Sequence, residues 1–468
     1  MRRIIREFML SCALLASPMV LVPIDAAMAQ ASDGAAGPAS QPVQPTPTQA
    51  VDGPSVEHLF GPWGGPFAGL ASRGVNFQLD AVSELAGNVS GGTKQGATFA
   101  NQVGLGIDIN WELLAKITGF STHAIFVNRS GSSDSNLFGD HLLPVQEIYG
   151  SGGDVGVHLV SVYGEETLLN GRFDLAAGRM NVENDFASSS LYCNFMTNAL
   201  CGDPKALPAG DIGHSAYPEA VWAARVRVKP TPQTYIETGV YEVNQGLYST
   251  QYDRTGFEFN TSRDSGVYIP VEIEWEPTLG PGNLPGHYKI GVGYDTSPGY
   301  KDFANVLAAA SVPGYVARER RGNTQVWGLI DQMVYRNGPM DNQGVTLLAG
   351  FVHNESTRTA YAEQYYAGFL DQGFWSLRPN DSINLLFTYV SISPQLIAVQ
   401  NVEQTYGLPL SNNATNVQSH EVVLEANYGI HLFRGVTLRP DFQYVIRPNA
   451  QTTIRDAAVF GCSTHITF

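Results

Sequence analysis

The chain has 468 residues, of which 43% are hydrophobic and 15% are charged, and its formal net charge at pH 7 is −16. So acidic a chain is a poor ligand for nucleic acids, whose phosphates attract clustered Lys and Arg, and we expect no nucleic-acid partner. Net charge by itself does not indicate a fold.

The N-terminus has the three parts of a bacterial secretory signal peptide. Arg2, Arg3 and Arg6 precede an apolar stretch, residues 8–24, and Ala27-Met28-Ala29 supplies a small-residue cleavage site. The apolar stretch is short and interrupted by prolines, which argues against a membrane anchor. We therefore predict export from the cytoplasm and leave this segment out of the fold.

The sequence predicts three parts along the chain. Residues 1–29 are the signal peptide, and residues 30–56 are rich in Pro, Ala and Gln, with few bulky apolar residues, which is typical of an extended periplasmic linker. Residues 57–468 remain for the folded part.

Residues 103–113, VGLGIDINWEL, alternate strictly between apolar and polar side chains. A period of two predicts a β-strand with one apolar and one polar face. In a soluble sandwich the apolar face would point to a core, whereas in a transmembrane barrel it would point to lipid. The other segments decide between these two alternatives.

Similar alternating segments recur along the rest of the chain, and we predict sixteen strands. Their approximate ranges are 74–86, 102–112, 120–130, 154–163, 171–180, 218–229, 233–244, 265–276, 287–297, 322–336, 343–354, 364–376, 380–391, 419–433, 435–447 and 456–468.

The connections between these strands alternate in length. Long gaps such as 87–101, 131–153 and 181–217 take turns with short ones such as 113–119 and 164–170. After residue 30 no stretch is apolar for 18 residues, so we predict no membrane-spanning helix. An even strand count with short and long connections in turn is typical of a bacterial outer-membrane barrel.

The faces of the strands support this interpretation. Trp111, Trp222, Trp275 and Tyr444 lie on apolar faces, where they would form aromatic girdles, although ordinary core aromatics are an alternative. The last strand alternates up to a C-terminal residue, Phe468, as outer-membrane barrels do. We predict an all-β, 16-stranded antiparallel transmembrane β-barrel with short periplasmic turns and long extracellular loops.

Three segments of the chain point to a known family. They are LFGPWGG with RGVNFQLDAVSELAGNVSGG, AAGRMNVENDFASSSLYCNF, and SHEVVLEANYGIHLFRGVTLRPDFQYVIRPNA. Together they resemble the carbohydrate-selective porin family of Gram-negative outer membranes. The resemblance runs from about residue 57 to residue 468, and Pro66-Phe67 departs from it where an arginine would be expected. The resemblance implies a 16-stranded barrel, passive diffusion of sugars and a constricted pore. We also predict location in the outer membrane, in contact with lipid, and no cofactor.

Sugars are neutral and rich in hydroxyl groups, so paired guanidinium and carboxylate groups suit a sugar-selective pore. We expect the pore-lining residues among Arg129, Arg179, Glu183, Asp185, Arg225, Arg227, Glu272 and Glu274. Arg225 and Glu272 are expected at similar depth, on strands separated by one neighbour. The alternative is that these charges pair with one another and brace the wall.

The longest gap, 181–217, is expected to fold into the barrel mouth and narrow it. Cys193 and Cys201 lie eight residues apart within it and are candidates for a disulfide in an oxidising compartment, with two thiols as the alternative and Cys462 as the remaining cysteine. No cysteine or histidine cluster has metal-site spacing, so we predict no metal.

We therefore expect an outer-membrane porin for small sugars, such as glucose-like mono- or oligosaccharides. A porin for small anionic solutes is the first alternative, because arginines on inward faces would attract phosphate or carboxylate. A barrel enzyme is the second, although no Gly-x-Ser-x-Gly elbow is present and we predict no enzyme activity. The preferred sugar and the choice between monomer and homo-oligomer stay open.

Overall fold

The structure is a computed structural model that describes residues 58–60, 68–149, 154–247, 255–311 and 319–468. The chain divides into two units, Met1–Pro47 and Thr48–Phe468, and all described residues belong to the second. The predicted signal peptide and linker lie outside the described residues.

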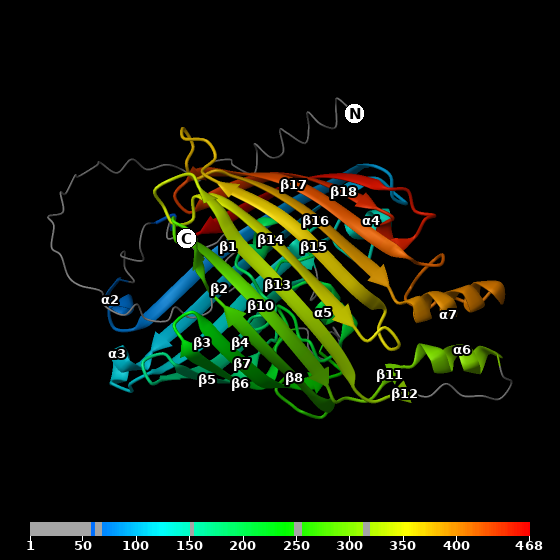
Figure 1. Ribbon diagram of the computed structural model, residues 1–468, viewed down its shortest axis with the longest axis horizontal. Coiled ribbons are helices and arrows are strands. Elements are labelled where there is room, and N and C mark those ends of the chain that lie inside the picture. The colour runs from blue at the N-terminus through cyan, green and yellow to red at the C-terminus, as the bar shows by residue number, and fades with distance from the viewer. Residues whose placement is uncertain (1–57, 61–67, 150–153, 248–254, 312–318) are drawn as a thin grey trace. The chain divides into compact units, whose positions relative to one another are not determined.

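Sixteen long strands form one closed antiparallel barrel (Figure 1). They are β1 (Val75–Ser90), β2 (Gly96–Asn110), β3 (Phe120–Gly131), β4 (Val155–Leu168), β5 (Phe173–Met180), β6 (Val221–Thr231), β7 (Thr234–Asn244), β8 (Asp264–Trp275), β10 (Leu284–Asp295), β13 (Asn323–Arg336), β14 (Gly344–Asn354), β15 (Tyr361–Gln372), β16 (Ser382–Ile392), β17 (His420–Phe433), β18 (Val436–Ile446) and β19 (Ala457–Thr467). Each pairs with its neighbours in chain order, and β19 pairs with β1.

The predicted barrel is confirmed, and every predicted strand overlaps one of these sixteen. The faces of β8 show how the strands are turned. Val271, Ile273 and Trp275 are 37 to 46% exposed, whereas Glu272 and Glu274 between them are 0 and 3% exposed. Apolar side chains therefore cover the outside and charged side chains face inward, which is the arrangement of a barrel in lipid.

Residues 103–113 follow the same rule for most of their length. Val103 is 38% exposed on the outer surface, while its neighbour Gln102 is buried inside the barrel. The strand ends at Asn110, and Trp111 begins a short helix, α3 (Trp111–Ala115), with Nε1–H donating to Thr122 Oγ1 at 3.0 Å. The expectation that Trp111 extends the strand is wrong, because the Asn110 side chain caps the helix by accepting from Leu113 N.

The first connection is also shorter than predicted. The gap expected at 87–101 shrinks to a turn, because β1 extends to Ser90 and β2 begins at Gly96. Gly91 and Gly92 have φ values of 75° and 64°, which a residue with a Cβ adopts rarely. Asn88 fixes the turn, since its Oδ1 accepts from Gly96 N at 3.0 Å and its Nδ2 donates to Lys94 O at 2.7 Å.

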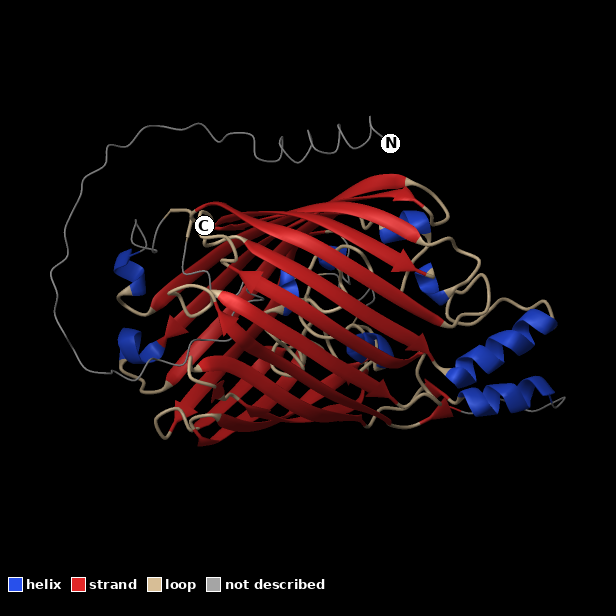
Figure 2. Ribbon diagram, turned by 45° about the horizontal axis from the view of Figure 1, so that its top comes forward, coloured by secondary structure: helices blue, strands red, loops and turns tan. Residues whose placement is uncertain are grey.

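The two ends of the barrel differ (Figures 1 and 2). Short connections with α2 (Ala68–Ala71) and α3 lie at one end, and the long connections lie at the other. The remaining helices are α4 (Ser135–Phe138), α5 (Ala206–Gly210), α6 (Phe303–Ser311), α7 (Pro394–Thr405) and the single turns η1 (Glu147–Tyr149), η2 (Tyr192–Asn194) and η3 (Pro448–Ala450). Three two-residue strands, β9 (Thr278–Leu279), β11 (Tyr300–Lys301) and β12 (Glu319–Arg320), complete the elements.

Within the described ranges, none of the helices has the length and apolar composition needed to cross a membrane.

Candidate functional site

The connection from β5 to β6, residues 181–220, runs into the barrel, and we call it the inward loop. Its helix α5 lies within the ring of strands (Figure 2). Side chains of the wall accept hydrogen bonds from backbone N–H groups of this loop: Glu272 from Ala187 (2.9 Å), Gln364 from Ala206 (2.8 Å), and Glu425 from Met196 (2.7 Å) and Thr197 (3.0 Å). These acceptors lie on three different strands, so the loop is fastened across the barrel.

Apolar packing also holds the inward loop. The rings of Phe186 and Tyr241 lie 6.0 Å apart, and those of Tyr192 and Tyr366 lie 5.7 Å apart, each pair joining the loop to the wall. All four side chains belong to one buried cluster. Burying a large apolar side chain contributes roughly 1.5–3 kcal/mol, so this part of the barrel is a packed core.

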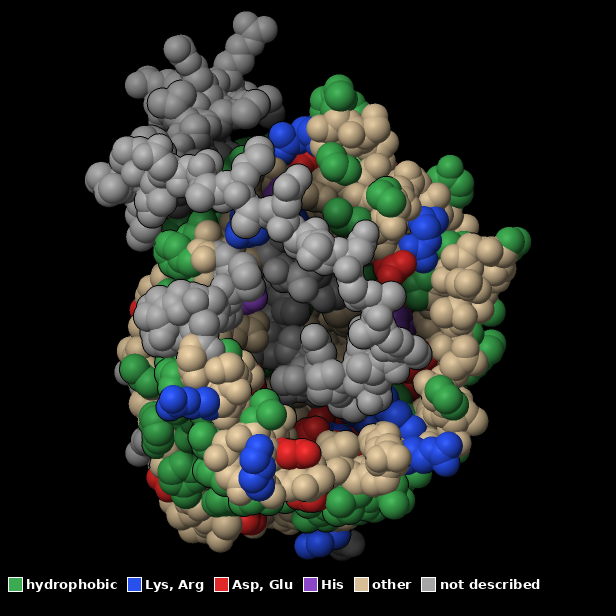
Figure 3. All heavy atoms as spheres, turned by 90° about the vertical axis from the view of Figure 1, so that its left-hand side faces the viewer, with side chains coloured by type: hydrophobic (Ala, Val, Ile, Leu, Met, Phe, Trp, Pro, Cys, Tyr) green, Lys and Arg blue, Asp and Glu red, His purple; other side chains and the backbone are tan. Residues whose placement is uncertain are grey.

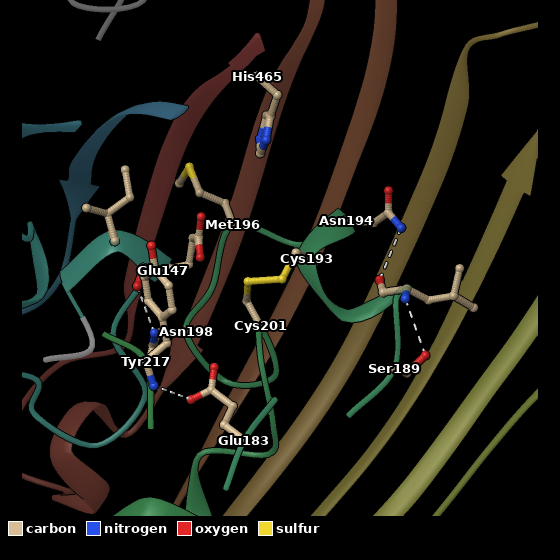
Figure 4. The surroundings of a disulfide bond; sticks show 12 residues. Glu147, Glu183, Ser189, Cys193, Asn194, Met196, Asn198, Cys201, Tyr217 and His465 are labelled. Atoms are coloured by element: carbon tan, nitrogen blue, oxygen red, sulfur yellow. Dashed lines mark hydrogen bonds between the residues drawn. A yellow bond between two sulfur atoms is a disulfide. The ribbon is translucent and has the colours of Figure 1, made fainter. Parts of the chain in front are cut away.

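A disulfide joins Cys193 and Cys201 within the inward loop, with Cα atoms 4.4 Å apart. A carboxylate oxygen of Glu147 and both sulfur atoms lie within 4.8 Å of one another. The loop is tied to the preceding long connection as well, because Asn198 donates to the backbone oxygens of Glu147 (2.8 Å) and Pro144 (2.7 Å). Figure 4 shows Glu147 and Asn198 beside the disulfide.

Next to the disulfide lies a polar cavity, which we call the charged pocket. Its empty volume is about 350 Å³, including space open to solvent. The lining residues come from β3, from η1 and from the inward loop, and they are Arg129, Glu147, Glu183, Asn198, Cys201, Asp203, Lys205, Pro208, Ala216 and Tyr217. Figure 3 views the molecule from the end with the short connections, where Lys, Arg, Asp and Glu side chains lie around the rim.

Groups of both charges and an aromatic face meet in the charged pocket. The guanidinium of Arg129 lies 4.9 Å from the ring centre of Tyr217, and its Nε donates to Gln102 Oε1 at 2.6 Å. Glu183 Oε2 accepts from the backbone N–H of Tyr217 at 2.9 Å, as Figure 4 shows. Asp203 and Lys205, from the middle of the inward loop, complete the set.

Burial changes how these groups ionise. Burial raises the pKa of Glu147 to about 7, although the nearby charge of Arg129 opposes the shift. Burial, followed by repulsion from Asp203, holds the pKa of Glu183 well above its usual range. Burial lowers the pKa of Lys205, and the carboxylates of Asp203 and Glu183 oppose that change. The charge of the pocket therefore depends on pH near neutrality.

Of the residues expected to line the pore, Arg129 and Glu183 line the charged pocket. Asp185 does not line it. Its Oδ2 accepts from the hydroxyl of Tyr241 at 2.7 Å, and its Oδ1 lies 3.2 Å from Nε of Arg225. Asp185 thus connects the inward loop to the wall.

Four charged residues were expected to face the lumen from two strands: Arg225 and Arg227 on β6, and Glu272 and Glu274 on β8. All four take part in ion pairs. Arg225 contacts Asp174 (2.6 Å) and Glu165 (3.2 Å), Arg227 contacts Glu237 (2.7 Å), and Lys289 contacts Glu274 (3.2 Å) and Glu272 (3.8 Å). Strand β7 lies between β6 and β8, as expected, but the register sets Arg227, Glu237 and Glu272 in one row. Arg225 pairs with Gly239 and therefore lies two residues along β6 from this row.

Arg179 lies on the outer face of the barrel, contrary to the expectation that it lines the pore. It stands in one row with Val162 and Trp222, which are 39 and 43% exposed. Residues opposite one another in a ladder share a face of the sheet, so the side chain of Arg179 points the same way. Its guanidinium lies 5.7 Å from the ring centre of Phe259, and the side chain is buried.

Sequence reasoning missed Glu147, Asn198, Asp203, Lys205 and Tyr217. All five lie in connections, where alternation of side chains carries no information. One signal was present: Asp203 and Lys205 lie two and four residues after Cys201, in the loop expected to narrow the barrel.

The chain was compared with known proteins. A model of the carbohydrate-selective porin, OprB family matches residues 94–468. Porin B of Pseudomonas aeruginosa is 28% identical over 427 residues, which cover 89% of this chain and 92% of that protein. The putative porin QuiX of Acinetobacter baylyi is 28% identical over 424 residues, covering 88% and 93%.

Solved structures resemble the fold. The high-pH structure of Pseudomonas putida OprB superposes with a TM-score of 0.80 at 24% identity, covering 88% of this chain and 99% of that one. At this level of identity the likeness supports the barrel architecture.

Proposed function

Because the chain belongs to the carbohydrate-selective porin family, we propose that it is a passive channel for small, glucose-like sugars and that the charged pocket is the part of the channel that contacts them. The protein is a porin of a Gram-negative outer membrane, and its relatives are channels and not enzymes. Membership of this family argues against the alternative of a barrel enzyme.

The charged pocket is the observation that carries this proposal. A sugar offers hydroxyl groups that both donate and accept hydrogen bonds. Arg129 and Lys205 supply donors, Glu183 and Asp203 supply acceptors, and the ring of Tyr217 supplies a flat apolar surface. A channel must release what it binds, so each of these contacts has to be weak.

The charged residues of β6 and β8 have a different proposed role. Because Arg225, Glu272 and Glu274 are buried in ion pairs or hold the inward loop, we assign them to bracing the wall. Arg227 also has a carboxylate partner, but its side chain is 18% exposed, so it stays a candidate for contact with solutes.

Small anions are the second candidate solutes. Arg129 and Lys205 favour them, while the pocket carboxylates oppose them whenever these are ionised. The ionisation of Glu147 near pH 7 therefore bears on the choice. Sugars are neutral, so a sugar channel would tolerate this change of charge better than an anion channel.

The location and sidedness follow from the same proposal. The end with the short connections would face the periplasm, together with a linker at 30–56 that follows cleavage of the signal peptide at 1–29. Apolar side chains around the barrel, such as Val271, Ile273 and Trp275, would contact outer-membrane lipid.

The proposal is tested by swelling of liposomes that contain the purified protein. We expect glucose-sized sugars to enter faster than amino acids of similar mass, and sugar to reduce the ion current through single channels. Entry rates that depend on size alone, together with a current that sugar leaves unchanged, would refute selectivity for carbohydrates. Faster entry of small organic anions than of sugars would favour the second candidate.

A further inference from the structure

Behind the charged pocket, buried side chains form one hydrogen-bonded row from the wall to the inward loop. The row consists of Asn354, Gln325, Tyr268, His214 and Asp203, each no more than 3% exposed. The first three belong to β14, β13 and β8, and the last two belong to the inward loop.

The wall end of the row has a fixed direction. Nδ2 of Asn354 donates to the backbone oxygen of Ala206 at 2.9 Å, so Oδ1 of Asn354 is an acceptor, and it accepts from Nε2 of Gln325 at 2.8 Å. Nε2 of Gln325 also donates to the backbone oxygen of Leu207 at 2.8 Å. Both partners of this nitrogen are oxygen atoms that accept, so the amide of Gln325 has a fixed orientation. Its other atom, Oε1, can only accept a hydrogen bond.

The single hydroxyl proton of Tyr268 then determines the protonation of His214. The hydroxyl of Tyr268 donates to Oε1 of Gln325 at 3.0 Å. The hydroxyl oxygen of Tyr268 also lies 3.1 Å from Nδ1 of His214. A phenol has one proton, so Nδ1 must carry a proton and donate it to Tyr268. The network is complete only with His214 protonated at Nδ1.

The second ring nitrogen of His214 meets Asp203. Nε2 of His214 lies 2.5 Å from Oδ2 of Asp203, a distance at which one proton lies between the two atoms. His214 and Asp203 together hold two protons, one on Nδ1 and one between Nε2 and Oδ2. The net charge of the pair is therefore zero, whether the shared proton is bound to His214 or to Asp203.

Packing keeps this row in place. The ring of His214 stands edge-on to Trp327, with centroids 6.4 Å apart and planes at 90°. A Cβ at Gly293 would lie 1.8 Å from the hydroxyl oxygen of Tyr268, so glycine at this position leaves room for the phenol. Neither Tyr268 nor His214 can turn away without disturbing these contacts.

We propose that His214 is a positioning residue of the channel: it holds Asp203 at the charged pocket and cancels its charge, so that the carboxylate accepts hydrogen bonds from a neutral sugar without attracting cations. This inference rests on the proposed function. An uncompensated carboxylate in a narrow, low-dielectric passage would concentrate cations there. Other charged groups near the pair are Lys205 and Glu183 on the pocket side and Asp211 and Asp295 beside Tyr268.

The inference is tested by ion selectivity in the absence of sugar, at one pH near 7. His214→Gln removes the balancing charge and leaves Asp203 ionised. A unit charge within roughly 8 Å of the ion path should raise the permeability ratio of cation to anion about two- to fivefold. The double variant His214→Gln/Asp203→Asn carries neither charge and should return the ratio to the wild-type value.

A matched control lies outside the lumen. His353 makes the same kind of contact, with Nδ1 2.6 Å from Oε1 of Glu363, on the exposed surface of the barrel. His353→Gln should leave the ratio unchanged. The inference is overturned if His214→Gln also leaves the permeability ratio unchanged, or if the double variant does not restore the wild-type ratio. His214 would then have only a structural role.

A spectroscopic measurement on the wild-type protein does not depend on whether a variant folds. In ¹⁵N-histidine-labelled wild-type protein, Nδ1 of His214 should carry a proton near pH 7. An Nδ1 without a proton would overturn the inference. Both tests are independent of sugar, so a wild-type channel that sugar does not block would contradict the proposed function and leave the charge assignment standing.

Discussion

Nε of Arg225 lies 3.2 Å from Oδ1 of Asp185, so a guanidinium of the barrel wall is paired with a carboxylate of the inward loop. The same guanidinium contacts Asp174 and Glu165 on the wall. One guanidinium therefore contacts three carboxyl groups and fastens the loop to the wall. Its role is mechanical, which leads to a first prediction.

Arg225→Gln should loosen the inward loop and raise single-channel conductance while leaving sugar affinity little changed. Removing one partner of a buried ion pair typically costs roughly 3–5 kcal/mol, because the other charges stay buried without compensation. Conductance in planar bilayers and the temperature of barrel unfolding measure the two effects. Arg227→Gln is the matched control, since Arg227 pairs with Glu237 of the wall. Equal effects of both variants would contradict the assignment.

The tip of the inward loop gives a second prediction. Glu425→Leu removes the acceptor of two backbone N–H groups and should increase conductance and current noise, because the loop loses its hold on β17. Glu274→Gln is the control, as Glu274 pairs with Lys289. Quiet channels of wild-type conductance in Glu425→Leu would show that apolar packing alone fixes the loop.

The disulfide supports a third prediction. Mass spectrometry of the mature, non-reduced protein should find Cys193 and Cys201 linked. The bond limits the open conformations of the loop, so its reduction should increase current noise at the charged pocket. Two thiols in the non-reduced protein, or identical recordings before and after reduction, would contradict this prediction.

A fourth prediction concerns pH. Because burial raises the pKa of Glu147 to about 7, its carboxyl is mostly neutral at pH 6 and mostly ionised at pH 8. The pocket thus gains negative charge as the pH rises, and selectivity should shift toward cations over this interval. Reversal potentials measured at both pH values test the shift, and Glu147→Gln should reduce it. A shift of full size in Glu147→Gln would assign the titration to another group.

The fifth prediction tests contact with sugar. Arg129→Gln should weaken sugar block of the ion current about tenfold or more, because a hydrogen bond to a charged group contributes roughly 1.5–3 kcal/mol. His353→Gln on the outer surface should not change it. Unchanged block in Arg129→Gln would place the sugar elsewhere in the lumen.

The strands could be predicted from the sequence because each barrel strand has an outer face that is apolar and an inner face that is polar. Where the two faces carry similar side chains, the ends and the faces of the strands are not predicted correctly. Residues 87–90 extend β1 although their alternation is weak, and the turn after them depends on Gly91 and Gly92. Arg179 was assigned to the lumen by its charge, whereas its register with Trp222 turns it outward.

The site was less predictable than the fold. Asp203, Lys205 and Tyr217 take their places from tertiary contacts of the inward loop, which no local pattern encodes. The protonation of His214 depends on Tyr268, Gln325 and Asn354, which come from three strands. Residues so distant in sequence become neighbours only in the closed barrel.

The contacts of the inward loop have a consequence for the order of assembly. Met196 is hydrogen-bonded to Glu425, 229 residues later in the chain. Closing so long a segment costs entropy before any contact offsets it, so such pairings form late. The loop cannot reach its final position before β17 has been delivered to the growing sheet. The narrowing of the lumen is therefore among the last features of the barrel to form.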